Sequence, residues 1–197
     1  MAHRPFHHGN LRAVLLDRAE AVLRERGLDA LSLRELAREA GVSHGAPRSH
    51  FADRRALLDA LAERGFARLA DELREAAARE PADPARTLRA ACSAYIAFAV
   101  REPALLDLMF AAKSDTPPQP VREAAERLFA TLAGIMGTGV AAGAYDAADV
   151  GRLTLLLSAT VQGAAALRTS GRITEEQGES LVDDAVAVFL AGLPSRR

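Results

Sequence analysis

Hydrophobic residues recur at three- and four-residue spacing along most of this chain, which is the spacing of one face of an α-helix. The first run follows a capping residue, Asn10, and stops at Gly27, a residue suited to a left-handed helix end. Further runs predict helices near residues 32–41, 43–51, 53–79, 84–101, 103–112, 121–142, 147–169 and 174–191. No stretch alternates with period two over the length of a strand. The pattern therefore predicts an all-α fold of about nine helices.

Two of the predicted helices are short and are separated by a tight turn. Ser32 followed by Glu35 forms a capping box, which marks the start of the first short helix. That helix ends at Gly41, the first residue of the stretch GVSHGAPRSHF at 41–51. A glycine allows a sharp turn here, and the spacing is that of a helix-turn-helix, whose second helix enters the major groove of DNA.

The second short helix has its own start signals. Ser43 is placed to cap it by accepting the amide proton of Ala46. Pro47 falls in its first turn, where the missing N–H costs little. Val42 and Phe51 are predicted to point inward and anchor the helix. The alternative is a solvated loop between two helices.

The remaining residues of this stretch predict an exposed face of small and polar groups. Glycine and alanine let a backbone approach DNA closely, and polar side chains reach phosphates or base edges. The candidates for DNA contact here are His44, Gly45, Ala46, Arg48, Ser49 and His50, with Ser32 and Ser43 at the starts of the two helices.

The charge distribution agrees weakly with an anionic partner for the N-terminal end. The whole chain has a net charge of −1, but residues 1–68 hold 12 arginines against 9 acidic residues. All five histidines also lie in this part of the chain. An excess of +3 is ordinary variation, so the charge supports DNA binding without establishing it.

The run ALSLRELAREAGVSHGAPRSHFADRRALLDAL resembles the helix-turn-helix and following helix of the TetR family of transcriptional repressors. The resemblance implies a DNA-binding domain at residues 1–54 and a ligand-binding and dimerisation domain at 55–197. It implies a phosphate contact for Arg54, where the family usually has lysine. The family usually has an aromatic residue where Arg48 stands, and a related subgroup often has a basic residue where Ser49 stands. Arg4, in the N-terminal arm, is a candidate for the minor groove.

The resemblance and the apolar pattern also imply two partners for the C-terminal region. The helices near 147–169 and 174–191 are apolar on more than one face, which predicts a homodimer through these last two helices. Mixed aromatic, methionine and polar positions suit a small, largely apolar effector, although ordinary core packing is the alternative for each. The candidate pocket residues are Tyr95, Phe98, Leu105, Met109, Phe110, Phe129, Met136 and Gln162.

Other chemistry finds little support in the sequence. The single cysteine, Cys92, excludes an internal disulfide and a cysteine-based zinc cluster. No catalytic motif, metal-ligand spacing or phosphate loop is present, so no cofactor and no enzymatic activity are expected. The apolar segment 153–167 is shorter than a membrane span, which predicts a buried helix in a cytoplasmic protein. The alternative function is a helical ligand-binding protein or enzyme with a vestigial helix-turn-helix.

Overall fold

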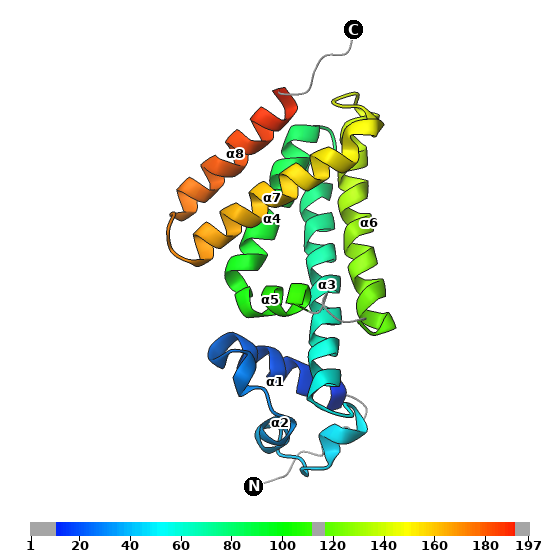
Figure 1. The fold of residues 1–197 in the computed structure, drawn as a ribbon, viewed down its shortest axis with the longest axis vertical. Coiled ribbons are helices and arrows are strands. Elements are labelled where there is room, and N and C mark those ends of the chain that lie inside the picture. The colour runs from blue at the N-terminus through cyan, green and yellow to red at the C-terminus, as the bar shows by residue number, and fades with distance from the viewer. Residues whose placement is uncertain (1–10, 112–116, 192–197) are drawn as a thin grey trace. The chain divides into compact units, whose positions relative to one another are not determined.

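The computed structural model describes residues 11–111 and 117–191, and these residues form helices and turns without a strand. The all-α prediction is confirmed. The described residues hold eight α-helices rather than about nine, because the second short helix forms as a 3-10 turn, η3. The helices are α1 (Leu11–Arg26), α2 (Leu33–Glu39), α3 (Arg54–Ala78), α4 (Pro84–Arg101), α5 (Pro103–Ala111), α6 (Gln119–Ala141), α7 (Val150–Thr169) and α8 (Glu175–Ala191), with short 3-10 turns η2 (Leu28–Ala30), η3 (Ala46–Ser49) and η4 (Ala147–Asp149) (Figure 1).

The chain divides into two compact units. The first combines Met1–Gly65 with Ala104–Val121, and the second combines Phe66–Pro103 with Arg122–Arg197. Helix α3 contributes its first half to one unit and its second half to the other. The domain boundary predicted after residue 54 lies inside the first unit, at the start of α3.

Local capping signals start several of the helices where the sequence predicts them. The Ser32 hydroxyl accepts the amide proton of Glu35 at 3.5 Å, so α2 begins as expected. The Asp53 carboxylate accepts the amide proton of Ala56 at 2.8 Å at the start of α3. Each cap satisfies a backbone donor that the first helical turn leaves unpaired.

The first unit is held by an apolar core and by one buried acid. Leu15, Leu36, Phe51, Leu57 and Leu61 are almost completely buried. These side chains come from α1, α2, α3 and the second residue after η3, so the core fixes the short helices around the start of α3.

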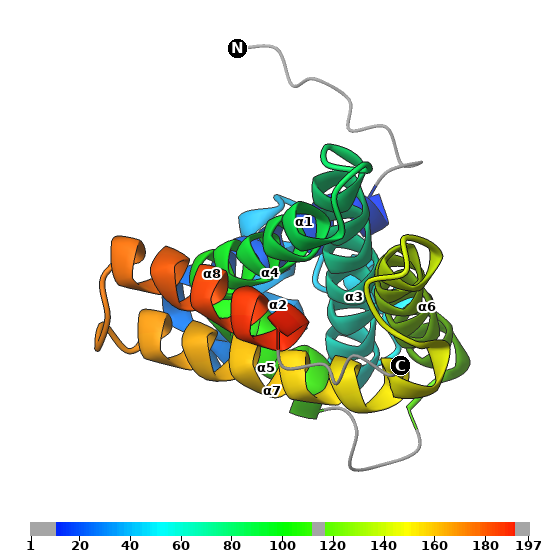
Figure 2. The ribbon, with the colours of Figure 1, turned by 90° about the horizontal axis from the view of Figure 1, so that it is seen from above.

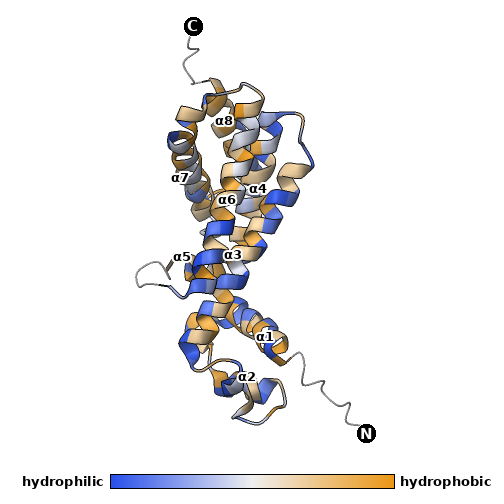
Figure 3. Ribbon diagram, turned by 90° about the vertical axis from the view of Figure 1, so that its right-hand side faces the viewer, coloured by the Kyte–Doolittle hydropathy of each residue, from blue (hydrophilic) through white to orange (hydrophobic). Residues whose placement is uncertain are grey.

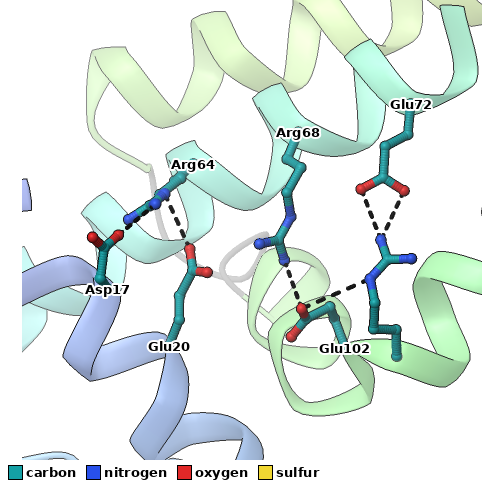
Figure 4. Close-up of polar contacts among 7 residues, drawn as sticks. Asp17, Glu20, Arg64, Arg68, Glu72 and Glu102 are labelled. Atoms are coloured by element: carbon teal, nitrogen blue, oxygen red, sulfur yellow. Dashed lines mark hydrogen bonds and ion pairs between the residues drawn. The ribbon is translucent and has the colours of Figure 1, made fainter. Parts of the chain in front are cut away.

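An ion-pair cluster adds to this packing. Arg64 of α3 reaches Asp17 at 2.6 Å and Glu20 at 3.2 Å, both on α1 (Figure 4). Glu20 is buried, and a buried carboxylate is tolerated when a cation pairs with it. The cluster therefore fixes α1 against α3 within the first unit.

The second unit is built around a three-helix layer. Helices α7 and α8 run antiparallel and both pack on α4, as Figures 1 and 2 show from two directions. Buried apolar side chains from each helix meet in this layer, among them Leu88 of α4, Val161 of α7 and Val186 of α8. This packing covers one side of α7 and α8 and leaves their other side open.

A second ion-pair cluster ties the end of α4 to α3 within the same unit. Arg68 reaches the buried Glu102 at 3.2 Å, and Arg101 reaches Glu72 at 2.7 Å (Figure 4). Both guanidinium groups also lie over the ring of Phe98, at 5.3 and 5.6 Å from its centroid. The pairing offsets the cost of burying Glu102 at the end of α4.

Candidate nucleic-acid interface

A glycine makes the turn between α2 and η3, as the sequence predicts. Gly41 has φ +68°, in the left-handed region that side chains other than glycine rarely adopt. Its amide donates to the Arg38 carbonyl at 3.2 Å, and the Val42 amide donates to the Ala37 carbonyl at 3.0 Å. This pattern of two bonds closes the end of α2 and reverses the chain.

The turn that follows is shorter than the predicted helix, and Pro47 supplies the reason. In an α-helix the amide of residue 47 would donate to the Ser43 carbonyl, but proline has no N–H. The Ser43 carbonyl instead accepts from the Ala46 amide at 3.0 Å, which is the bonding of a 3-10 turn. The prediction that the Ser43 side chain caps this element is therefore wrong, because η3 has no side-chain cap.

Pro47 and Phe51 anchor the turn to the core. Both residues are buried, and the Pro47 carbonyl accepts the amide protons of His50 at 3.0 Å and Phe51 at 2.8 Å. Val42, predicted as the other anchor, is half-buried. The buried pair fixes which side of η3 faces outward.

The outward side carries the predicted small and polar groups. Ser43, His44, Gly45, Arg48 and Ser49 are exposed, and Ala46 and His50 are half-buried. The Ser49 hydroxyl donates to the Ala46 carbonyl at 2.7 Å, so only its oxygen remains available as an acceptor. Arg48 makes no hydrogen bond or ion pair with another described residue, which leaves its guanidinium donors available to an anion.

Arg54 has a structural contact that local sequence patterns do not indicate. Its guanidinium donates to the Leu31 carbonyl at 3.0 Å and to the Leu28 carbonyl at 2.7 Å. These carbonyls belong to the segment between α1 and α2, so Arg54 fixes that segment to the start of α3. The exposed side chain retains further N–H groups for the predicted phosphate contact. Arg4 lies outside the described residues.

Four other arginines of the first unit, Arg26, Arg38, Arg55 and Arg64, have an acidic partner. Arg26 pairs with Glu39 at 2.7 Å, and the hydrogen bond raises the pKa of Arg26. Arg38 pairs with Glu35 at 2.5 Å, and this contact lowers the pKa of Glu35. The Glu35 carboxylate thus binds Arg38, while the Glu35 amide donates to the Ser32 hydroxyl. Of the arginines in residues 11–65, those with no hydrogen bond or ion pair to another described residue are Arg12, Arg18, Arg34 and Arg48.

The predicted effector residues divide between the two units. Leu105, Met109 and Phe110 of α5 belong to the first unit, and Tyr95, Phe98, Phe129, Met136 and Gln162 belong to the second. Phe98, Leu105, Met109 and Met136 are buried, whereas Tyr95 and Phe110 are half-buried. Burial raises the pKa of the Tyr95 hydroxyl. Phe129 is 50% exposed and Gln162 is also exposed, so the described residues enclose neither.

Part of this set has a clear packing role. A methyl group added at Gly65 of α3 would lie 2.6 Å from the Met109 sulfur and 3.2 Å from the Leu105 side chain. The two side chains therefore fill the space that Gly65 leaves, within the first unit. The second unit has two grooves, one at α7 and α8 and one at α3 and α6. None of the predicted effector residues lines either groove.

The outer side of α7 and α8 is an open apolar face. Leu155 is 73% exposed, Leu156 is 52% exposed and Val188 of α8 is 71% exposed. A groove of about 440 Å³ runs between the helices and is lined mostly by apolar side chains. Hydrophobic positions recur along both helices in Figure 3. We refer to Leu155, Leu156, Val188 and this groove together as the α7–α8 face.

Helix α7 is only partly covered by the rest of the chain. Residues Ala147–Thr169 are long and apolar enough to cross a membrane by length and composition alone, a property that core helices of soluble proteins share. One side of α7 packs within the second unit, and the other side, with Leu155 and Leu156, is left open. Among the described residues no three His, Cys, Asp or Glu side chains gather as metal ligands.

A helix-turn-helix unit combined with a second helical unit that exposes an apolar face defines a helix-turn-helix regulatory protein. Residues 15–61 match the model of the bacterial regulatory proteins of the tetR family, and residues 88–189 match the tetracyclin repressor-like C-terminal domain. The chain therefore belongs to the TetR family and is a transcriptional regulator.

Solved structures show the same fold over nearly the whole chain. A protein of unknown function from Rhodococcus sp. RHA1 is 41% identical with a TM-score of 0.88, covering 97% of this chain and 99% of its own. A transcriptional regulator from the same organism is 28% identical with a TM-score of 0.72, covering 98% and 100%. A TetR family transcription regulator from Marinobacter aquaeolei VT8 is 17% identical with a TM-score of 0.69, covering 90% and 94%, and shows the fold alone. No protein of curated function matches the chain.

Proposed function

We propose that this regulator is a repressor that binds a palindromic DNA operator as a homodimer and leaves it when a small, largely apolar ligand binds. It acts in the cytoplasm, with no membrane as a partner, and without a cofactor or an enzymatic activity. One observation carries the proposal: the described chain holds one helix-turn-helix and also exposes the apolar α7–α8 face. The first feature suits DNA, and the second suits another copy of the chain.

The exposed side chains favour dimerisation energetically. Burying a leucine or valine side chain is worth roughly 1.5–3 kcal/mol, so a partner that covers Leu155, Leu156 and Val188 gains substantially. Gly163 and Ala166, both exposed on α7, leave room for a second helix to approach closely. A twofold copy would pair α7 and α8 with their equivalents in a four-helix interface.

Dimerisation determines the kind of DNA site. We call residues 43–51, which contain η3, the recognition turn. Two recognition turns related by a twofold axis read two half-sites about 34–36 Å apart, one turn of the double helix, and the operator is then palindromic. The proposed contacts are base edges or phosphates for Arg48, Ser49 and His50, close backbone approach at Gly45 and Ala46, a phosphate for Arg54 and the minor groove for Arg4. His44, Ser32 and Ser43 complete the proposed DNA-facing set.

The effector acts by shifting a population between two conformations. A ligand bound by the predicted effector residues would favour the conformation in which the recognition turns no longer fit both half-sites. Apolar residues dominate that set, with Tyr95 and Gln162 as polar members, which suits an apolar ligand with few polar atoms.

Selection of duplexes from a randomised DNA pool by the purified protein tests this function. We expect recovery of a palindromic sequence, binding that weakens steeply with salt, and a dimer to one duplex by mass. A footprint on DNA upstream of the protein's own gene is the companion experiment. If no duplex is selected and no salt-dependent binding is found, the repressor function is wrong and a helical ligand-binding protein remains.

A further inference from the structure

We propose that Arg12, at the start of α1, is a DNA phosphate-binding residue whose guanidinium is held in place by the ring of Phe51. The inference rests on the proposed function, because it adds a contact to the same DNA-binding surface. Neither the helix-turn-helix pattern nor the family match assigns a role to this position.

The position of Arg12 is set by the recognition turn itself. Its guanidinium carbon lies over the Phe51 ring, 5.5 Å from the centroid. Phe51 is only 2% exposed, and its amide donates to the Pro47 carbonyl at 2.8 Å. The ring is therefore fixed to the end of η3, and Arg12 is placed beside the turn that carries Arg48.

The stacked guanidinium keeps its hydrogen-bonding capacity. A cation over an aromatic face uses its charge and its flat surface, whereas the N–H groups of arginine lie along the edges of that plane. Arg12 is exposed and makes no hydrogen bond or ion pair with another described residue. Its donors are thus free for a phosphate oxygen, and the stack lowers the entropy lost when the side chain binds.

The other arginines near this surface show what distinguishes Arg12. Arg26, Arg38, Arg55 and Arg64 are each paired with an acidic side chain. Arg18 is exposed on the same helix as Arg12 and also has no such partner, but no aromatic ring orients it. Six residues of helix separate the two side chains by about 9 Å along the axis and by roughly 120° around it. Arg18 is the matched control.

The experiment measures the salt dependence of DNA binding for single variants. Wild type, Arg12→Gln, Arg12→Lys and Arg18→Gln are titrated with the labelled duplex that the wild type selects from a randomised pool, over a series of salt concentrations. Circular dichroism and light scattering confirm that each variant is folded and has the wild-type mass. Lysine keeps the charge without the planar stack, so it separates the two contributions.

We expect Arg12→Gln to bind at least about tenfold more weakly at low salt, since hydrogen bonds to charged groups have this strength. Its slope of log affinity against log salt should fall by about 1.8, because a dimer loses two phosphate contacts worth roughly 0.9 each. Arg12→Lys should keep the slope and bind with intermediate affinity, and Arg18→Gln should resemble wild type.

Two outcomes overturn the inference while leaving the proposed function intact. In the first, Arg12→Gln binds with the wild-type affinity and slope. In the second, Arg18→Gln loses as much as Arg12→Gln, which would show a general charge effect rather than a positioned contact. A wild-type protein that binds no duplex in a salt-dependent manner would instead overturn the proposed function, and the inference with it.

Discussion

The recognition turn and the α7–α8 face are both exposed, but their chemistry is opposite. The turn places small and polar residues outward and buries its two apolar members, Pro47 and Phe51. The α7–α8 face does the reverse, because it exposes apolar side chains. Leu155 and Val188 are among the most exposed apolar side chains of the described chain. Water solvates the first surface well and the second poorly.

The difference shows why exposure alone does not identify a site. Two neighbouring residues on α8 differ strongly in exposure, since Val188 is 71% exposed whereas Phe189 is 5% exposed. Phe189 packs edge-on against Tyr145 with ring centroids 5.9 Å apart. One side of α8 therefore builds the fold, and the other is available to a partner. If the two surfaces have separate partners, mutations should affect them independently.

The largest effect is expected from a charge in the α7–α8 face. Leu155→Glu should convert the dimer to a monomer, since a carboxylate buried without a partner costs far more than the leucine gains. A monomer contacts one half-site only, so operator affinity should fall by more than about 100-fold, a free-energy loss of ~3 kcal/mol or more. Analytical ultracentrifugation and DNA titration measure the two effects.

Val100→Glu provides the control for that variant. Val100 is 41% exposed but belongs to α4, not to α7 or α8. We expect this variant to remain a dimer with wild-type DNA affinity. A dimeric Leu155→Glu protein would show that another surface joins the two copies.

The recognition turn should respond in the opposite way. Arg48→Ala should weaken operator binding by ~1–3 kcal/mol and relax specificity if the side chain reads a base, while dimer mass is unchanged. DNA titration with point-substituted operators separates base reading from phosphate binding, because a phosphate contact weakens all duplexes equally. Unchanged binding would remove Arg48 from the interface.

A third test compares two glycines of α6 that differ in their surroundings. A methyl group at Gly139 would clash with the ring and hydroxyl of Tyr145, which donates to the Met136 carbonyl at 2.7 Å. Gly139→Ala should lower the free energy of unfolding by ~1–3 kcal/mol through overpacking of this support for α8. Gly137 has no atom within 4 Å of an added methyl group, so Gly137→Ala should be neutral or stabilising by up to about 1 kcal/mol. Urea denaturation of both variants measures the contrast, and equal effects would contradict the packing explanation.

The sequence predicted the features of this molecule that depend on near neighbours. The Ser32 cap and the Gly41 turn each involve residues within a few positions, and the structure confirms both. The effect of Pro47 is also local, but placing it in a first helical turn overlooked the lost bond to Ser43. That bond decides between an α-helix and a 3-10 turn.

Contacts between distant positions could not be predicted in this way. Arg54 binds carbonyls 23 and 26 positions away, and Arg12 stacks on Phe51 across most of the first unit. The spacing of hydrophobic residues indicates which side of a helix is apolar. It does not indicate which side chain of another element packs against that side. For the same reason the sequence indicated that α7 was apolar all round but not which of its sides stays open, and the effector residues remain a prediction.

The smallest effect is expected at Cys92, on the side of α4 that α7 and α8 cover. Burial raises the pKa of its thiol to about 12, so the reactive thiolate is scarce and the sulfur is inaccessible. An unfolded cysteine has a pKa of about 8.5, so the fold favours the neutral thiol, and this contribution to stability is lost as pH rises from about 8.5 toward 12.

A thiol-specific dye at pH 8 should label native protein slowly and urea-unfolded protein quickly. The Leu155→Glu monomer should stay as protected as wild type, because the inner sides of α7 and α8 still cover α4. Rapid labelling of that monomer would show that the dimer contact and the core of the second unit are not separate.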